Sequence, residues 1–137
     1  MTTERLESRH VSVWIDARPA DVYAYVVDPR NLPHWAAGLA SGEVTLVDGR
    51  WSVSSPLGES TVEFAPDNAF GILDHVVRLP DGREFYNPMR VVPEGEGGAG
   101  CEVVFTVRRR AGVGENEFDA DVEAVAADLQ RLGSIVG

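Results

Sequence analysis

The chain has 137 residues, of which 44% are apolar and 25% charged, the balance of an ordinary soluble globular domain. Its net charge of −10 repels phosphate backbones and anionic lipid, so we expect neither nucleic acid nor membranes as partners. All twelve Lys and Arg positions are arginine, which excludes Schiff-base catalysis, lysine-anchored pyridoxal phosphate and P-loop nucleotide binding, because each needs a lysine amine.

The first predicted strand covers Arg9–Ile15, where apolar and polar residues alternate. Its valines and Ile15 share one face, which we expect to be buried. Trp14 lies on the opposite face and is predicted to be a surface or subunit-contact residue, so the sequence leaves open whether the protein forms a homodimer. Residues 1–8 are polar and lack the apolar core of a signal peptide, which predicts a loose N-terminal segment and a cytoplasmic location.

Two short helices are predicted next, separated by a break at Asp28-Pro29. Pro19 suits the first position of a helix, and an apolar stripe then runs to Val26 at helical spacing. The residue before a proline is pushed out of helical geometry, so the first helix ends there. Asn31–Trp35 predicts a second helix of one or two turns. Two short helices joined at a kink can follow the edge of a sheet, whereas a single long helix could not.

The middle of the chain, residues 42–109, predicts only strands and turns. Clusters of Gly, Pro, Asn and Asp mark the turns. The predicted strands are Glu43–Val47, Arg50–Ser55, Glu59–Phe64, Ile72–Leu79, Arg83–Val92 and Cys101–Arg109. Residues 95–100 have the spacing G-x-G-x-x-G, but a strand follows them instead of the helix that a dinucleotide site needs, so we interpret them as a hairpin loop.

The longest predicted helix lies near the C-terminal end. Its large apolar residues recur at helical spacing and form one continuous face, which consists of Phe118, Val122, Val125, Leu129 and Leu132. Asn116 fits the N-terminal cap of this helix, and Gly133 fits its end. The order of elements predicts one α+β domain over residues 1–137, with seven antiparallel strands curved around the final helix and two short helices between strands 1 and 2.

Four stretches carry a resemblance to a known superfamily: A-R-P-A-D-V-Y-A-Y-V-V-D-P-R-N-L-P-H-W, G-I-L-D-H-V-V-R-L-P-D-G, P-M-R-V-V-P and F-D-A-D-V-E-A-V-A-A-D-L-Q-R-L. From about His10 to Ile135 the chain resembles the START-like (SRPBCC, helix-grip) superfamily, and within it the polyketide cyclase/dehydratase-like group. The resemblance implies a seven-stranded antiparallel sheet that grips the C-terminal helix. It also implies an apolar cavity between sheet and helix, with Trp35 near the cavity mouth.

Strand phase and turn geometry select the candidate residues of the cavity wall. The charged Asp74 is expected to face outward, which turns His75 inward. Pro80-Asp81-Gly82 predicts a three-residue hairpin loop, and counting outward from it pairs His75 with Asn87. The predicted pairing depends on the geometry at Pro88, because a bulge there would rotate Asn87 away from the cavity. The candidate ligand-binding residues are Trp35, Trp51, His75, Asn87, Met89 and Phe118.

The sequence is compatible with three functions. The leading hypothesis is binding of a small, largely apolar molecule, aromatic or polyketide-like, in the cavity. One alternative is a cyclase or dehydratase acting on such a molecule with His75 as general acid or base. Another is a protein-interaction module of the chaperone-activator kind, with the cavity filled by side chains. With one cysteine and three histidines that lack metal-ligand spacing, no metal site and no cofactor is expected.

Overall fold

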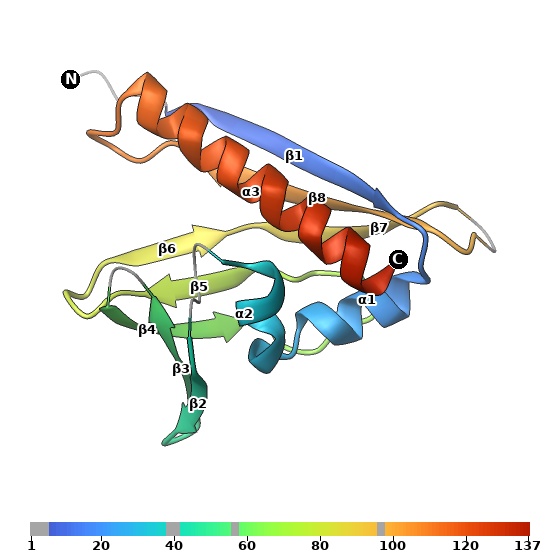
Figure 1. Ribbon diagram of the computed structural model, residues 1–137, viewed down its shortest axis with the longest axis horizontal. Coiled ribbons are helices and arrows are strands. Elements are labelled where there is room, and N and C mark those ends of the chain that lie inside the picture. Colours follow the sequence, from blue (N-terminus) through green and yellow to red (C-terminus); the bar gives the residue numbers. More distant parts are fainter. Residues whose placement is uncertain (1–5, 38–41, 56–57, 96–97) are drawn as a thin grey trace.

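The computed structural model describes residues 6–37, 42–55, 58–95 and 98–137. Within these ranges two antiparallel sheets lie on one side of a long C-terminal helix, and the short helices cover the end of the sheets (Figure 1). The elements in chain order are β1 Ser8–Ile15, α1 Pro19–Val26, the 3₁₀ helix η1 Pro29–Asn31, α2 Leu32–Trp35, β2 Val44–Val47, β3 Arg50–Ser55, β4 Gly58–Phe64, β5 His75–Arg78, β6 Glu84–Asn87, β7 Met89–Pro93, β8 Cys101–Arg108 and α3 Glu115–Val136.

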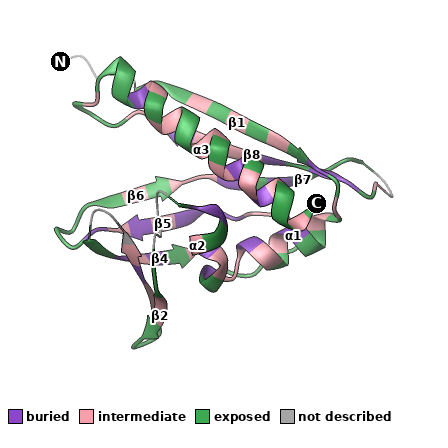
Figure 2. Ribbon diagram, in the orientation of Figure 1, coloured by how far each residue is buried: buried purple, intermediate pink, exposed green. Residues whose placement is uncertain are grey.

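The predicted break between the two short helices is confirmed, and its cause is local. α1 ends at Val26, and the carboxylate of Asp28 accepts hydrogen bonds from the backbone N–H of Arg30 at 3.1 Å and from its side chain at 2.8 Å. The helices η1 and α2 follow directly after this capping residue. Val22 and Leu32 are fully buried, so α1 and α2 both turn an apolar side toward the core (Figure 2).

The predicted single sheet of seven strands is corrected: the described residues form eight strands in two sheets, with the orders β1-β8-β7 and β2-β3-β4-β5-β6. The predicted strand Arg83–Val92 is split at Pro88 into β6 and β7. Proline has no N–H to donate, so the regular β5–β6 ladder ends there. Beyond it the same register continues in reduced form: Ile72 bridges Arg90, and the N–H of Leu73 donates to the carbonyl of Met89 at 2.9 Å. The carbonyl of Pro88 instead accepts a hydrogen bond from the N–H of Thr106 at 3.0 Å, which ties the break to β8.

Asp74 stabilises the chain at this break. Its carboxylate accepts hydrogen bonds from the Tyr86 hydroxyl at 2.8 Å, the Met89 N–H at 2.9 Å and the Arg90 guanidinium at 3.2 Å. Burial by itself would raise the pKa of Asp74, but these hydrogen bonds together outweigh it and hold that pKa below its ordinary value. A single carboxylate therefore connects the last residues of β6 with the first residues of β7.

Helix α3 packs against β1 and β8, as its apolar stripe predicts. Phe118, Leu129 and Leu132 are fully buried. The predicted ends are wrong: the helix begins at Glu115, after Gly114, and it continues through Gly133 to Val136. Gly133 lies next to Ile15 and Val13 of β1, where an added Cβ would make ordinary van der Waals contact at 3.7 Å. No helix in the described part of the chain is long and apolar enough to cross a membrane.

We predict that Asp74→Ala lowers the free energy of unfolding by about 2–4 kcal/mol, because it leaves the buried N–H of Met89 without an acceptor and removes the hydrogen bonds of Tyr86 and Arg90. Urea denaturation with an unchanged m-value measures this loss. Glu84→Gln is the matched control: it breaks the exposed pair of Glu84 with Arg78, 2.8 Å long, and is expected to cost less than about 1 kcal/mol. Equal losses in the two variants would contradict a special role for Asp74.

Candidate functional site

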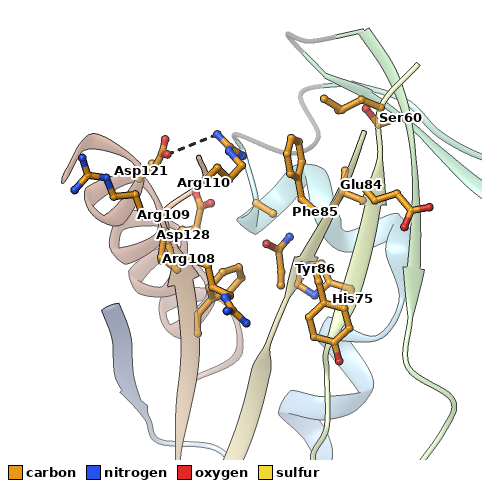
Figure 3. Close-up of a pocket in the computed structure, with 18 of the residues that line it drawn as sticks. Ser60, His75, Glu84, Phe85, Tyr86, Arg108, Arg109, Arg110, Asp121 and Asp128 are labelled. Carbon is orange, nitrogen blue, oxygen red and sulfur yellow. Dashed lines mark ion pairs between the residues drawn. The ribbon is translucent and has the colours of Figure 1, made fainter. Parts of the chain in front are cut away.

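The main cavity lies between α3 and the strands β4, β5, β6 and β8, and has a volume of about 650 Å³. Figure 3 shows Asp121 and Asp128 on the helix side and Ser60 and His75 on the strands that face it. Most of its wall is apolar, with contributions from Trp35, Val77, Leu79, Phe85, Phe105 and Leu129. Its size falls within the range of small-molecule sites, roughly 300–1,000 Å³.

His75 is the most deeply buried titratable group of this wall, with 2% of its surface exposed. Its ring lies 5.0 Å from the ring of Phe64 and 5.9 Å from that of Phe105. Nδ1 lies 3.0 Å from the carbonyl oxygen of Leu73, and because a carbonyl oxygen only accepts, Nδ1 carries the proton. Burial lowers the pKa of His75, which keeps the ring neutral and leaves a lone pair on Nε2.

The predicted pairing of His75 with Asn87 is confirmed by the register of β5 and β6. Both side chains line the main cavity, so the strand break at Pro88 comes one residue too late to turn Asn87 away. Among the hydrogen bonds of the described residues, none joins the two side chains or engages the amide of Asn87. The pair therefore presents unused hydrogen-bonding groups in an otherwise apolar region.

Two further polar atoms of the wall are completely buried. Nε1 of Trp35 and Oγ of Ser60 have no hydrogen-bond partner within the described part of the chain. Leaving such a group without a partner costs about 1–3 kcal/mol. The main cavity thus combines a large apolar surface with buried polar groups that a bound molecule or ordered water would satisfy.

Charged residues lie where the main cavity meets the surface. The guanidinium of Arg110 stacks 4.4 Å from the centre of the Phe85 ring and forms an ion pair with Asp121 at 3.8 Å (Figure 3). Asp128 accepts a hydrogen bond from Arg131 at 2.8 Å, yet its burial raises the pKa of its carboxyl group. The mouth therefore carries paired charges of both signs. No cluster of metal-ligating side chains occurs among the residues that the structure describes.

The other candidate residues lie elsewhere. Trp51 lines a second hollow of about 360 Å³ beside Pro29. Met89 and Phe118 are fully buried core residues that do not line the main cavity. Met89 lies beyond the break, in the other sheet, and Phe118 packs under the guanidinium of Arg9 at 4.9 Å. Strand phase predicts which face is inward, but it does not show where that face changes from cavity wall to packed core.

The sequence reasoning missed the charged part of the site. In the sequence the run Arg108–Arg110 follows an apolar strand and is typical of a solvated strand end, and neither Asp121 nor Asp128 is among the predicted site residues. Asp128 follows Val125 by three residues, so the two side chains lie on the same face of the helix. This spacing could have indicated that Asp128 also lines the cavity. No local pattern indicates Arg110, because its partners come from β6 and α3.

No family model and no curated protein matches the chain. Several solved structures do match it. A START superfamily protein from Mycobacterium smegmatis is 13% identical over 94% of this chain and 96% of its own, with a TM-score of 0.66. Ara h 8.0201 is 14% identical over 96% and 98%, with a TM-score of 0.65. Truncated norcoclaurine synthase from Thalictrum flavum is 16% identical over 99% and 98%, with a TM-score of 0.60.

At these identities the likeness concerns the fold alone. The three structures and the arrangement of sheets and helix agree that the chain has a START-like fold, with a long C-terminal helix held by antiparallel strands. The helix-grip fold that the sequence motifs indicate is thereby confirmed.

His75 makes the stability of the protein depend on pH. The unfolded chain takes up a proton on this imidazole near its ordinary pKa of 6.5, whereas the folded protein resists protonation to lower pH. The free energy of unfolding should therefore fall as the pH drops below about 6.5, by up to about 1.4 kcal/mol per pH unit from this group.

We predict that His75→Gln removes this contribution to the pH dependence of the free energy of unfolding. Urea midpoints of the two proteins, measured from neutral pH down to mildly acidic pH, test it. Above the ordinary pKa of histidine the two slopes should coincide, which serves as the internal control. If the two proteins show the same pH dependence below the ordinary pKa of histidine, His75 is not held neutral by burial.

Proposed function

We propose that the protein binds a small, largely apolar molecule in the main cavity. The observation that carries this proposal is a cavity of about 650 Å³ whose apolar wall contains buried polar groups without partners. Sites for small molecules have this composition, because apolar surface supplies affinity and a few polar groups fix orientation. The aromatic side chains of Trp35, Phe85 and Phe105 favour a flat, aromatic or polyketide-like ligand.

An enzyme of the polyketide cyclase type is the second candidate function. Its support is the lone pair on Nε2 of His75, since a neutral imidazole in a cavity can remove a proton from a bound molecule. The fold also occurs in an enzyme, norcoclaurine synthase, one form of which was solved with a transition-state analogue. His75 would act here as a base, because its lowered pKa leaves no proton on Nε2 to donate near neutral pH.

A protein-interaction module with a filled interior has less support. Such a module would fill the space between sheet and helix with side chains, whereas here about 650 Å³ stays open. The net charge of −10 also disfavours nucleic acid as an occupant. Trp14 is 52% exposed on the outer face of β1, which suits a contact between two copies of the chain and leaves the cavity accessible.

Native mass spectrometry of the protein, purified from its own host, tests the binding proposal directly. A small molecule that leaves the protein on activation in the gas phase would support it. If the substitution His75→Ala weakens retention of that molecule, the molecule binds in the main cavity. Protein that binds neither a co-purified molecule nor added apolar compounds would contradict the proposal.

Trp35 should report occupancy of the main cavity, since it is 2% exposed and lines the wall. We predict that bromobenzene, whose bromine quenches indole near contact, quenches Trp35 saturably in the double variant Trp14→Phe, Trp51→Phe. The matched variant that keeps only Trp14 should show linear, collisional quenching, because Trp14 lies on the outer face. Saturable quenching of equal size in both variants would mean that the probe binds elsewhere.

A further inference from the structure

Two polar side chains lie directly opposite each other in the apolar wall of the main cavity. His75 on β5 and Asn87 on β6 are partners in the antiparallel register, and both line the cavity. Opposed residues of antiparallel strands have their Cβ atoms about 4.5–5.5 Å apart. One small chemical group of a ligand can therefore reach both side chains at once.

His75 offers this group only an acceptor. Leu73 has a carbonyl oxygen 3.0 Å from Nδ1, so the ring proton is on Nδ1 and Nε2 has the lone pair. The rings of Phe64 and Phe105 and the nearly complete burial of His75 keep the imidazole uncharged. A ligand atom that approaches Nε2 must therefore carry a hydrogen to donate.

Asn87 offers the complementary partner. Its amide has both N–H donors and a carbonyl acceptor, and no hydrogen bond of the described residues engages it. The amide can turn its N–H toward an oxygen bound beside His75. The two residues together thus fit a group that donates one hydrogen bond and accepts another through the same atom.

We propose that His75 and Asn87 hold one hydroxyl group of an uncharged ligand: its O–H donates to Nε2 of His75 and its oxygen accepts from the amide of Asn87. This inference rests on the proposed function and specifies the ligand class, an apolar molecule with a phenolic or alcoholic hydroxyl. A bare carbonyl or ether is disfavoured, because its lone pairs would face the lone pair of Nε2.

A carboxylate is disfavoured for a second reason. Most basic groups near the cavity have partners: Arg110 is engaged by Phe85 and Asp121, Arg109 by Val113 and Glu7, and Arg131 by Asp128, whereas Arg108 is exposed. Beside the buried, uncharged ring of His75 an anion would lose its hydration, and no ion pair or ring contact of the described residues brings an arginine to His75. The site therefore selects against acids and in favour of neutral hydroxyl compounds.

A matched series of naphthalenes tests this on the unmodified protein by titration calorimetry near neutral pH. 2-Naphthol can donate and accept, 2-methoxynaphthalene can only accept, naphthalene can do neither, and 2-naphthoate is an anion. We expect 2-naphthol to bind roughly five- to tenfold more tightly than 2-methoxynaphthalene, the effect of one ordinary hydrogen bond, and 2-naphthoate to bind most weakly.

Each other outcome overturns the inference in a distinguishable way. Equal binding of naphthol, methoxynaphthalene and naphthalene would overturn the hydroxyl site and leave the binding proposal standing. Tightest binding of naphthoate would show an anion site instead. Binding of none of the four compounds would overturn the binding proposal together with the inference.

Variants assign the preference to the two residues. In His75→Leu and Asn87→Leu the preference for naphthol over methoxynaphthalene should fall to about onefold, whereas His75→Gln, whose amide oxygen supplies an acceptor, should restore part of it. Trp14→Phe, on the outer face of β1, is the control that keeps the full preference. A preference that survives both leucine variants would place the hydroxyl elsewhere.

Discussion

The hydrogen bonds of Asp74 stabilise the chain at Pro88, where the regular pairing of β6 with β5 gives way to that of β7 with β8, next to the wall of the main cavity. The proline cannot donate to a ladder, so β6 remains with β5 while β7 pairs with β8. Asp74 accepts from groups on both sides of the break, the Tyr86 hydroxyl and the Met89 N–H. On either side of this point β6 lies beside β5 and β7 beside β8 (Figure 1), and residues of β4, β5, β6, β8 and α3 line the main cavity.

Helix α3 covers this cavity and is held along its length. Near its first turn the guanidinium of Arg9 lies over the Phe118 ring, and near its last turns Leu132 and Gly133 pack close to β1. Between these anchors the helix faces the cavity, and Val125 is only half-buried there. The amphipathic stripe thus serves two purposes, core packing at the ends and a ligand-accessible wall in the centre.

The elements and the pairing across the β5–β6 hairpin could be predicted, because both depend on local rules. A three-residue loop determines which residues lie opposite each other, and alternation determines which face is inward, so the pair of His75 and Asn87 followed from sequence. Met89 was assigned to the same wall because its backbone remains paired with Leu73, and nothing local shows that its side chain packs in the core instead. The role of Asp74 was also missed, since its partners come together only through that register.

The state of His75 also bears on which chemistry the cavity can support. A dehydration requires a proton donor to the departing hydroxyl, and Nε2 of His75 carries none, because its proton is held on Nδ1 by Leu73. The features that make this imidazole a good partner for a hydroxyl thus make it a poor catalyst for expelling one. Asp128 has a raised pKa, but it is paired with Arg131 on the helix side. Among the proposed activities, holding a hydroxylated molecule or removing one of its protons therefore fits this wall better than dehydration does.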